Sequence, residues 1–445
     1  MEWINRYVFG TAVPILLILA GIFFGVRLRM FPLLHPIRTL RALTGKGRKE
    51  GVSPFRALTL SLAGTLGVGN IVGVSAAISV GGFGAVFWMW VSALCAMLLK
   101  YAEIVLAMRH RRFDQDGKPH GAAMYYIRDC FSRMGLDGFG GALAALFALL
   151  CMLNAVTMGS VVQVSAVTDA VEGVFRVPPL VTGIVLALAS YSVIRRGTGG
   201  MLALTEKLVP LMTLGYLILS AAVLILRAER LPDAFSMILS SAFATDAAVG
   251  GIGGFLLSKG VRYGTMRGLL SNEAGCGTAP AAHAVSDCAV PAEQGVWGIF
   301  EVFTDTILLC TVTALAVIVS WGDVVARDGE FMMMTVTAYS SVLGGSAAVF
   351  MAIAVLFFGF ATVICWAHYG TESAAYLSEK TFFRRGFTFL YVGSIIYGAF
   401  ASSEVIWQSA DFAIGAMTLI NVTVLCLMHR EVREETDRWL GRKRN

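Results

Sequence analysis

The stretch SLAGTLGVGNIVG, residues 61–73, lies inside the second long apolar segment of the chain. It carries Gly64, Gly67, Gly69 and Gly73 within ten residues. Glycine in a helix interior costs about 1 kcal/mol relative to alanine, so this cluster predicts a point where a helix unwinds. Unwound backbone inside a membrane is tolerated only where it is buried in protein or lines a cavity. The stretch therefore predicts a membrane helix that is broken at a binding site.

The chain is far more apolar than a soluble protein of its length. Of its 445 residues, 57% are hydrophobic and 14% are charged, against roughly 25% charged in ordinary soluble domains. The apolar residues form long runs, and a run of about 20 residues matches the hydrocarbon core of a bilayer. We therefore predict an all-α polytopic membrane protein with about eleven membrane-spanning helices. The predicted spans are residues 8–26, 57–80, 83–108, 140–168, 179–194, 208–226, 238–258, 295–320, 344–369, 387–403 and 408–428.

The basic residues alternate between the two ends of the predicted spans. Most of the 35 lysines and arginines lie in six segments, residues 27–56, 109–139, 195–207, 259–267, 380–385 and 430–445. Short basic loops mark the cytoplasmic side, so we expect the N-terminus outside and the C-terminus in the cytoplasm, in the cell (inner or plasma) membrane. The scatter of basic residues among short loops argues against nucleic-acid binding. The strongly basic loop after residues 8–26 favours a first membrane helix there over a signal peptide.

A second glycine cluster, AVGGIGGF at residues 248–255, lies in the seventh predicted span. Small residues at such spacing also let two helices pack closely, which is the alternative for either cluster. The positions of the two clusters in the order of spans favour a break. If the first predicted helix is set aside, ten helices remain, and the two interrupted helices are the first and the sixth of these ten. Two five-helix halves have opposite orientations, and paired breaks in such an inverted repeat indicate the binding site of a secondary transporter. Residues 271–275, by contrast, are predicted to lie in a cytoplasmic or interfacial helix.

This organisation divides the chain into four parts. They are an N-terminal helix with a basic loop (1–56), a first five-helix repeat (57–227), a second five-helix repeat (236–428) and a basic cytoplasmic tail (429–445). No soluble domain is predicted, because a domain needs at least about 50 residues and no stretch between the spans is that long.

A few polar residues lie deep in the predicted spans, where they are costly and often functional. The fourth span contains Asn154, Ser160, Gln163 and Ser165. Gln163 offers both a donor and an acceptor to a zwitterion, and a helix–helix hydrogen bond is the alternative. Thr362 and Trp366 stand one turn apart in the ninth span, where a hydroxyl can bind a cation and an indole can close a small pocket. An interfacial anchor is the alternative for Trp366.

Charged residues inside the spans are rarer still. Glu301 and Asp305 are four residues apart and share a helix face in the eighth span. They are interpreted as a buried structural pair, with a role in proton coupling as the alternative. Lys100 and Glu103 end the third span and are predicted to reach the membrane interface with their long side chains.

At this point the motifs resemble those of the alanine/glycine:cation symporter family (sodium:alanine symporters). The resemblance covers about residues 55 to 412. It rests on GTLGVGNIVG (64–73), GGFGAVFWMW (81–90), KYAE (100–103), MYYI (124–127), ALTEKLVP (203–210), RYG (262–264), SNEAG (271–275), APAAH (279–283) and WAHYGTE (366–372), and on QG at 294–295 and DT at 305–306.

The resemblance implies a leucine-transporter-type fold of eleven helices, in which two broken helices, a middle helix and a late helix surround a small amino acid. Sodium is the implied coupling ion, bound between the first broken helix and the late one. The implied substrate contacts are Gly67, Val68, Gly69 and Asn70 for the carboxylate, Gln163 and carbonyls of Gly250, Gly251, Ile252, Gly253 and Gly254 for the ammonium, and Trp366 as a wall. The implied sodium ligands are the Thr362 hydroxyl and backbone carbonyls of Ala361, Gly64 and Gly67.

The sequence departs from the family pattern at several positions. Ala361 stands where a serine is common, which removes one hydroxyl from the implied sodium site. Ile252 stands where an aromatic residue is common, so the pocket is wider or differently shaped. Ala122 and Ala123 replace a Gly-Pro pair, and the family's asparagine near Ser160 is missing.

The sequence thus predicts a symporter that carries a small neutral amino acid, alanine or glycine, into the cell with sodium by alternating access. Its partners would be that amino acid, sodium and the lipid bilayer. A proton-coupled symporter and a non-transporting sensor or channel on the same fold are the alternatives. Enzymatic activity is not expected, because the chain lacks H-E-x-x-H, P-loop and G-x-S-x-G motifs. The eight cysteines form no C-x-x-C pair, so no disulfide, metal centre or other cofactor is expected.

Overall fold

The computed structural model describes residues 12–44, 51–115, 117–243, 259–323, 331–401 and 404–442, and these residues are helical almost throughout. The helices and strands in chain order are α2 (Val13–Arg27), α3 (Phe31–Leu34), α4 (Pro36–Ala42), α5 (Pro54–Thr65), η2 (Gly69–Gly73), α6 (Val74–Gly81), α7 (Gly84–His110), β1 (Arg112–Phe113), β2 (Pro119–His120), α8 (Ala123–Ser132), α9 (Asp137–Val156), η3 (Thr157–Val162), α10 (Gln163–Phe175), α11 (Pro179–Ile194), α12 (Gly197–Leu226), η4 (Ala228–Arg230), α13 (Leu231–Ala242), α15 (Lys259–Asn272), α16 (Ala279–His283), α17 (Pro291–Val302), η6 (Phe303–Cys310), α18 (Thr311–Val319), η7 (Trp321–Asp323), α19 (Phe331–Leu343), α20 (Ser346–Leu377), α21 (Thr381–Gly398), α22 (Glu404–Leu427) and α23 (His429–Trp439). The elements η2, η3 and η6 are π-helical, and η4 and η7 are 3₁₀ turns.

Six helical segments of the described chain are long and apolar enough to cross a membrane. They are Gly84–His110, Asp137–Phe175, Gly197–Leu226, Pro291–Val319, Ser346–Leu377 and Val405–Leu427. Two of them continue through a π-helical segment, η3 in the first case and η6 in the second. This confirms the polytopic helical membrane protein predicted from composition.

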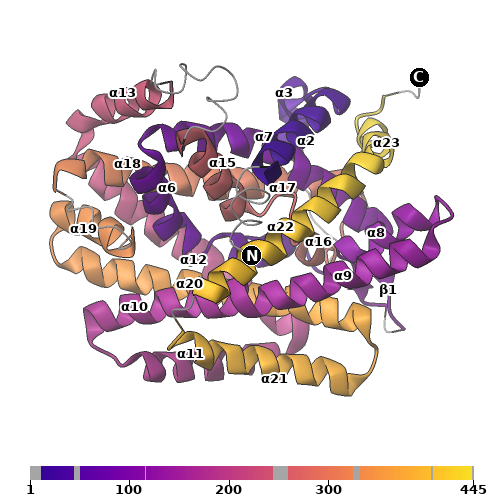
Figure 1. The fold of residues 1–445 in the computed structure, drawn as a ribbon. Helices are drawn as coiled ribbons and strands as arrows, with labels where there is room; N and C mark the ends of the chain where they lie inside the picture. The colour runs from indigo at the N-terminus through magenta and orange to yellow at the C-terminus, as the bar shows by residue number, and fades with distance from the viewer. Residues whose placement is uncertain are drawn as a thin grey trace.

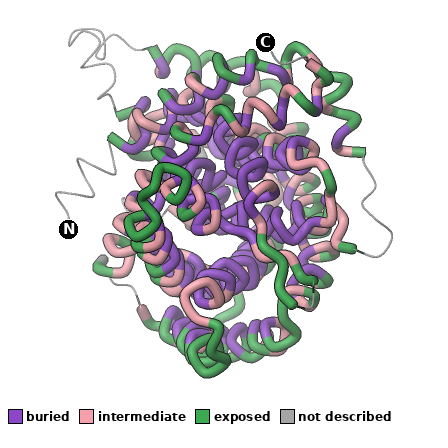
Figure 2. The backbone as a smooth tube through the Cα atoms, turned by 90° about the vertical axis from the view of Figure 1, so that its right-hand side faces the viewer, coloured by how far each residue is buried: buried purple, intermediate pink, exposed green. Residues whose placement is uncertain are grey.

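The outer surface of the bundle suits lipid. Leu188 of α11 and Leu211 and Ile225 of α12 are 66%, 66% and 74% exposed. Figure 1 shows α11 beside α21 along the lower edge of the molecule, and Figure 2 shows that the buried residues gather in the interior. Large apolar side chains on an outer face are stable in hydrocarbon, whereas extensive apolar patches are rare on soluble monomers.

The first broken helix lies where the glycine cluster predicts it. Helix α5 begins at Pro54 after Ser53, whose hydroxyl oxygen accepts the backbone N–H of Arg56 at 3.3 Å, as expected for an N-cap. The helix ends at Thr65, and after a short break the chain continues as η2 and α6 with a bend of 55°. The prediction of a broken helix within residues 61–73 is confirmed.

Helix α15 packs along α7 and α6, and it begins at the end of the bundle where α6 turns into α7. The backbone carbonyl of Lys259 lies 3.3 Å from the position of a β-carbon on Gly81. A β-carbon on Gly264 would lie 2.2 Å from the Ala85 carbonyl oxygen. The helix therefore runs from the α6–α7 turn toward the middle of the bundle, in close backbone contact with α7.

This course contradicts two predictions. A β-carbon on Gly84 would lie 2.5 Å from the Ala242 backbone nitrogen, so the chain on both sides of residues 244–258 lies at the same end of α7. The prediction that residues 238–258 form one membrane-spanning helix is therefore wrong. The prediction that residues 259–267 form a cytoplasmic loop, on the side opposite the α6–α7 turn, is wrong as well, because these basic residues belong to α15, which begins beside that turn.

The second described break lies between α15 and α16. Here Glu273, Gly275 and Gly277 have φ angles of +53°, +83° and +77°, a left-handed conformation that favours glycine. The prediction that residues 271–275 lie in a cytoplasmic or interfacial helix is wrong, since these residues are buried and interrupt a helix within the bundle. Gly250, Gly251, Ile252, Gly253 and Gly254 lie outside the described residues.

Candidate functional site

The first break presents the backbone around Gly67 to side chains from other helices. The N–H of Gly67 donates to Asn70 Oδ1 at 3.1 Å, and the N–H of Val68 donates to Gln163 Oε1 at 3.2 Å. Gly69 is exposed, and a β-carbon there would meet no described atom within 4 Å. At the break, the N–H groups of Gly67 and Val68 are thus hydrogen-bonded to side-chain oxygens, and the space next to Gly69 is open.

Gln163 and Thr362 converge on Gly67 from two different helices. A β-carbon on Gly67 would lie 2.9 Å from Thr362 Oγ1 and 3.1 Å from Gln163 Oε1. Thr362 donates its hydroxyl proton to the Phe358 carbonyl oxygen at 3.0 Å, which leaves the lone pairs of its oxygen free to face the break. A side chain at position 67 would displace the Thr362 hydroxyl and crowd the Gln163 amide, and the structure brings these three predicted site residues together.

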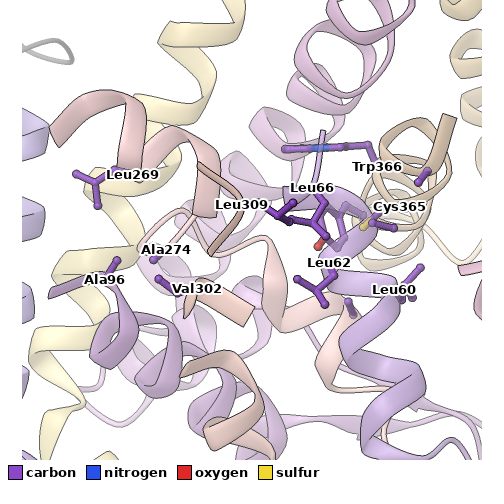
Figure 3. Packing of buried hydrophobic residues seen from close by; sticks show 14 of the residues in the cluster. Leu60, Leu62, Leu66, Ala96, Leu269, Ala274, Val302, Leu309, Cys365 and Trp366 are labelled. Carbon is purple, nitrogen blue, oxygen red and sulfur yellow. The ribbon is translucent and has the colours of Figure 1, made fainter. Parts of the chain in front are cut away.

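Trp366 lies on α20, four residues after Thr362, and is buried in the bundle. Its side chain is 1% exposed and packs on Gly159, where a β-carbon would lie 2.3 Å from the Trp366 side chain. The ring lies edge-on to Tyr369, with 5.3 Å between the ring centroids. Figure 3 shows Trp366 and Cys365 of α20 beside Leu66 at the break. Trp366 is therefore a buried residue of the bundle interior and not an interfacial anchor.

The residues of the implied sodium site also lie where α5 meets α20. A β-carbon on Gly64 would lie 2.8 Å from Cys365 Sγ and 3.2 Å from the Tyr369 hydroxyl oxygen. Ala361 is fully buried one residue before Thr362. The Thr65 and Tyr369 hydroxyl oxygens are buried without a hydrogen-bond partner in the described part of the chain. Unpaired buried oxygens are costly, and a cation between α5 and α20 would use such ligands.

Asp305 lies on the other side of the break, in η6. Its carboxylate accepts hydrogen bonds from Asn70 Nδ2 at 2.6 Å, Ser271 Oγ at 2.9 Å and Thr306 Oγ1 at 2.7 Å. Cys310 Sγ lies 3.5 Å from both Asn70 Nδ2 and Ser271 Oγ. The amide of Asn70 therefore joins the first break to η6 and to the end of α15.

Glu301 belongs to a separate buried network. Its carboxylate forms an ion pair with Lys100 Nζ at 3.2 Å, accepts from Ser61 Oγ at 2.9 Å and lies 2.9 Å from His283 Nε2. Gln294 Nε2 lies 2.8 Å from His283 Nδ1. Glu301 and Asp305 are both buried, as predicted, but each has its own partners.

The prediction that Lys100 and Glu103 reach the membrane interface is wrong. Both side chains are fully buried. Glu103 Oε1 accepts from the Gly277 N–H at 2.9 Å and from Asn421 Nδ2 at 2.5 Å. Hydropathy cannot reveal such partners, because each contact joins residues far apart in the chain.

Sequence reasoning gave no site role to Ser271 or Cys310. The sequence predicts Ser271 in a cytoplasmic or interfacial helix, and it predicts no role for Cys310. The small and polar residues from Ser271 to Gly277 include two glycines close together, as the first break does, and such a pattern can indicate a broken helix. The preceding residues Lys259, Arg262 and Arg267 make this segment too polar to be recognised as a membrane helix from its composition.

The whole chain, residues 1–445, matches the family model described as the sodium:alanine symporter family. The chain belongs to this family. It is 35% identical to an uncharacterized transporter of Haemophilus influenzae, over 99% of this chain and 95% of the relative. It is 34% identical to the sodium/alanine symporter AgcS of Methanococcus maripaludis, over 97% and 95%. A putative sodium/proton-dependent alanine carrier of Bacillus subtilis is 32% identical, over 96% and 89%.

Solved structures of transporters share the fold of this family member. The structure of MhsT in complex with L-phenylalanine has a TM-score of 0.55 and 15% identity, and the match covers 88% of this chain and 93% of that one. A manganese transporter of Eremococcus coleocola has a TM-score of 0.53 and 15% identity, with coverage of 84% and 78%. These likenesses confirm the predicted leucine-transporter-type fold. The chain is thus a multi-pass membrane transporter of this family.

Proposed function

We propose that the protein is a sodium-coupled symporter that carries alanine or glycine into the cell by alternating access. The observation that supports this proposal most directly is the convergence of Gln163 and Thr362 on Gly67, beside the exposed backbone of Gly69. In secondary transporters of this design, unwound backbone offers N–H groups to an anion and carbonyl groups to a cation.

The substrate would bind with its carboxylate toward the first break. The N–H groups of Gly67 and Val68 now donate to Asn70 and Gln163, so a carboxylate would replace one or both of these side-chain oxygens. Gln163 would then be free to accept from the substrate ammonium. Trp366 packs closely on Gly159, with no space for a β-carbon between them, which favours a small side chain in the substrate.

Sodium would bind between α5 and α20. The proposed ligands are the Thr362 hydroxyl oxygen and the carbonyl oxygens of Gly64, Gly67 and Ala361. Sodium is a hard cation that prefers oxygen ligands, as Ca²⁺ and Mg²⁺ do. The unpaired Thr65 and Tyr369 hydroxyls next to Gly64 support a cation in this part of the bundle.

Uptake of labelled alanine and glycine into proteoliposomes tests this function. We expect saturable uptake that an inward sodium gradient accelerates at least about tenfold. Counterflow by internal unlabelled alanine would distinguish a carrier from a channel or a sensor. Uptake that is indifferent to sodium would refute the proposed coupling ion.

Proton coupling is the second candidate. It is supported by a buried carboxylate beside the first break, Asp305, whose hydrogen-bond partners at the site are neutral. One relative is named as a putative sodium/proton-dependent alanine carrier. In the same proteoliposomes, an inward proton gradient without sodium would drive uptake if this candidate holds.

A further inference from the structure

Asp305 differs from the other buried carboxylate of its helix in how its charge is balanced. Glu301 is ion-paired with Lys100 and lies against His283. Asp305 is equally buried, but within the described residues no lysine, arginine or histidine forms an ion pair with it. Its three donors, Asn70, Ser271 and Thr306, are all neutral. Burying a carboxylate without a paired cation is costly, and such groups tend to neutralise instead.

The neutral donors come from both broken helices. Asn70 is the second residue of η2, immediately after the first break, and Ser271 is the penultimate residue of α15, immediately before the second break. Asp305 therefore connects the two unwound regions through one carboxylate. We call this set, Asp305 with Asn70, Ser271 and Thr306, the Asp305 latch.

The orientation of the Asn70 amide favours a proton over a metal ion as the ligand of this carboxylate. Asn70 Oδ1 accepts from the Gly67 N–H, which turns the NH₂ group toward Asp305. A metal ion requires lone pairs directed at it, whereas Asp305 is surrounded by N–H and O–H donors. A proton needs no additional ligands and removes the buried charge directly.

The charged groups around Asp305 are distributed over several elements. Lys100 of α7 attracts the carboxylate but is already paired with Glu301. Glu273, at the second break, interacts with Asp305 as a like charge, and Glu301 lies one turn earlier on the same helix. The Cys310 thiol shares the Asn70 and Ser271 donors. Four buried carboxylates, those of Glu103, Glu273, Glu301 and Asp305, thus share one buried lysine that is ion-paired with Glu301. This arrangement favours uptake of a proton by a carboxylate without an ion pair, and among these Asp305 is the one that is hydrogen-bonded to Asn70 and Ser271.

We propose that Asp305 binds a proton from water during the transport cycle and that this proton opens the latch. The conclusion rests on the transport function proposed above. Protonation places an O–H donor on the carboxyl group, opposite the NH₂ donor of Asn70 and the hydroxyl of Ser271. The charge-assisted hydrogen bonds, which are roughly twice as strong as neutral ones, are then lost. The two broken helices become free to move relative to η6.

Hydrogen–deuterium exchange of the substrate-free, full-length protein tests the latch. Peptides covering residues 66–73 report on the first break, after correction for the intrinsic pH dependence of amide exchange. We expect their protection to fall about tenfold between pH 8 and pH 5 in the wild type, because local opening sets the exchange rate. Asp305→Asn should show the low protection of the acid state at both pH values.

Two further variants complete the test. Ser271→Ala keeps the carboxylate but removes one donor, so the midpoint of the pH profile should move to higher pH. Asp169→Asn changes an exposed carboxylate of α10 and should leave the profile unchanged. A wild-type profile that does not depend on pH, or an Asp305→Asn protein with the wild-type pH response, would overturn the proposal.

Because hydrogen–deuterium exchange is measured without substrate, failure of the latch proposal can be distinguished from failure of the proposed transport function. If labelled alanine is neither bound nor transported but exchange at residues 66–73 still depends on Asp305 and pH, the substrate assignment fails and the latch stands. If alanine uptake is driven by sodium while exchange is independent of Asp305, the latch fails and the function stands.

Discussion

At the residue scale, the site depends on a few polar atoms that replace the missing helical hydrogen bonds of the first break. Gln163 supplies the acceptor for the Val68 N–H, and Asn70 accepts from the Gly67 N–H, which also donates to the Thr65 carbonyl oxygen at 2.9 Å. An unpaired buried N–H costs about 1–3 kcal/mol. These side chains therefore stabilise the unwound backbone before any ligand arrives.

Gln163→Ala should weaken alanine binding at least about tenfold, because it removes the proposed acceptor for the substrate ammonium. Binding of labelled alanine to the purified protein measures the effect. Ser165→Ala is the control, since this residue of the same helix is half-buried and no role in the site is proposed for it. Unchanged affinity of Gln163→Ala would exclude Gln163 from the site.

The contact between Gly159 and Trp366 can be tested with a single methyl group. Gly159→Ala would place a β-carbon 2.3 Å from the Trp366 side chain, so the indole must move. Overpacking of this kind typically costs about 1–3 kcal/mol, and we expect a lower melting temperature together with weaker alanine binding. Gly138→Ala in α9, where a β-carbon meets no described atom within 4 Å, should leave both unchanged.

At the element scale, α15 is a half-helix that is held by backbone contact with α7. A β-carbon on Gly264 would lie 2.2 Å from the Ala85 carbonyl oxygen, which cannot move without displacing α7. Close approach of this kind is typical of membrane helices with small residues at their interface. The contact positions Ser271 beside Asp305, because Ser271 lies about two turns further along the same helix.

Gly264→Ala should therefore separate α15 from α7 and lower thermal stability by about 1–3 kcal/mol. Gly215→Ala in α12, with open space around its β-carbon, is the matched control. The melting temperatures of both variants can be measured with a thiol-reactive dye that reports exposure of the buried cysteines on unfolding. Equal melting temperatures for Gly264→Ala and the wild type would contradict the observed packing.

The hairpin of β1 and β2 is attached to the end of α20 by a histidine. His120 Nδ1 lies 2.9 Å from Glu372 Oε2, and His120 Nε2 lies 3.4 Å from Asp114 Oδ2. The hydrogen bond to Glu372 raises the pKa of His120 above its usual value, against the opposing effect of burial and with support from Asp114. This contact therefore stabilises the hairpin when His120 is protonated.

The resulting pH dependence has a defined sign. Because the folded pKa is raised, the contribution is complete below the unfolded pKa of about 6.5 and is lost as pH rises through the higher folded value. We expect exchange protection of the peptide 112–120 to fall between pH 6 and pH 9 after intrinsic correction. The loss should be absent in His120→Ala, and a wild-type peptide that is equally protected throughout would contradict the assignment.

At the scale of the whole molecule, the Glu301 network joins α5, the first half of the first broken helix, to three other elements. Ser61 belongs to α5, Lys100 to α7, His283 to α16 and Glu301 to α17. All four side chains are fully buried. Breaking a buried ion pair by removing one partner typically costs about 3–5 kcal/mol, because a charge is left uncompensated.

Lys100→Met should strongly lower the melting temperature, and Lys100→Met with Glu301→Gln should recover part of the loss. The double variant removes both charges and leaves neutral groups that can still bond to Ser61 and His283. Thermal unfolding of the three proteins forms the test. A double variant that is as unstable as the sum of the two single variants would show that the two charges do not interact.

The amino-acid sequence by itself determined the membrane helices and the first break. Both follow from local composition, since about 20 apolar residues match a bilayer and clustered glycines destabilise a helix wherever they stand. The sequence also predicted Gln163, Thr362 and Trp366 as candidate site residues, because polar and aromatic side chains deep inside apolar runs are often functional.

Only the tertiary structure decided the position of the described second break and the partners of the buried charges. Helix α15 is too polar to be recognised by hydropathy, but it is covered by α6 and α7 instead of lipid, so its basic residues do not indicate a cytoplasmic loop. Asn70 and Asp305 are 235 residues apart in the chain. Their contact depends on how whole helices pack, and no local pattern encodes it. The broken helix predicted from residues 61–73 acquires its function only through these distant partners.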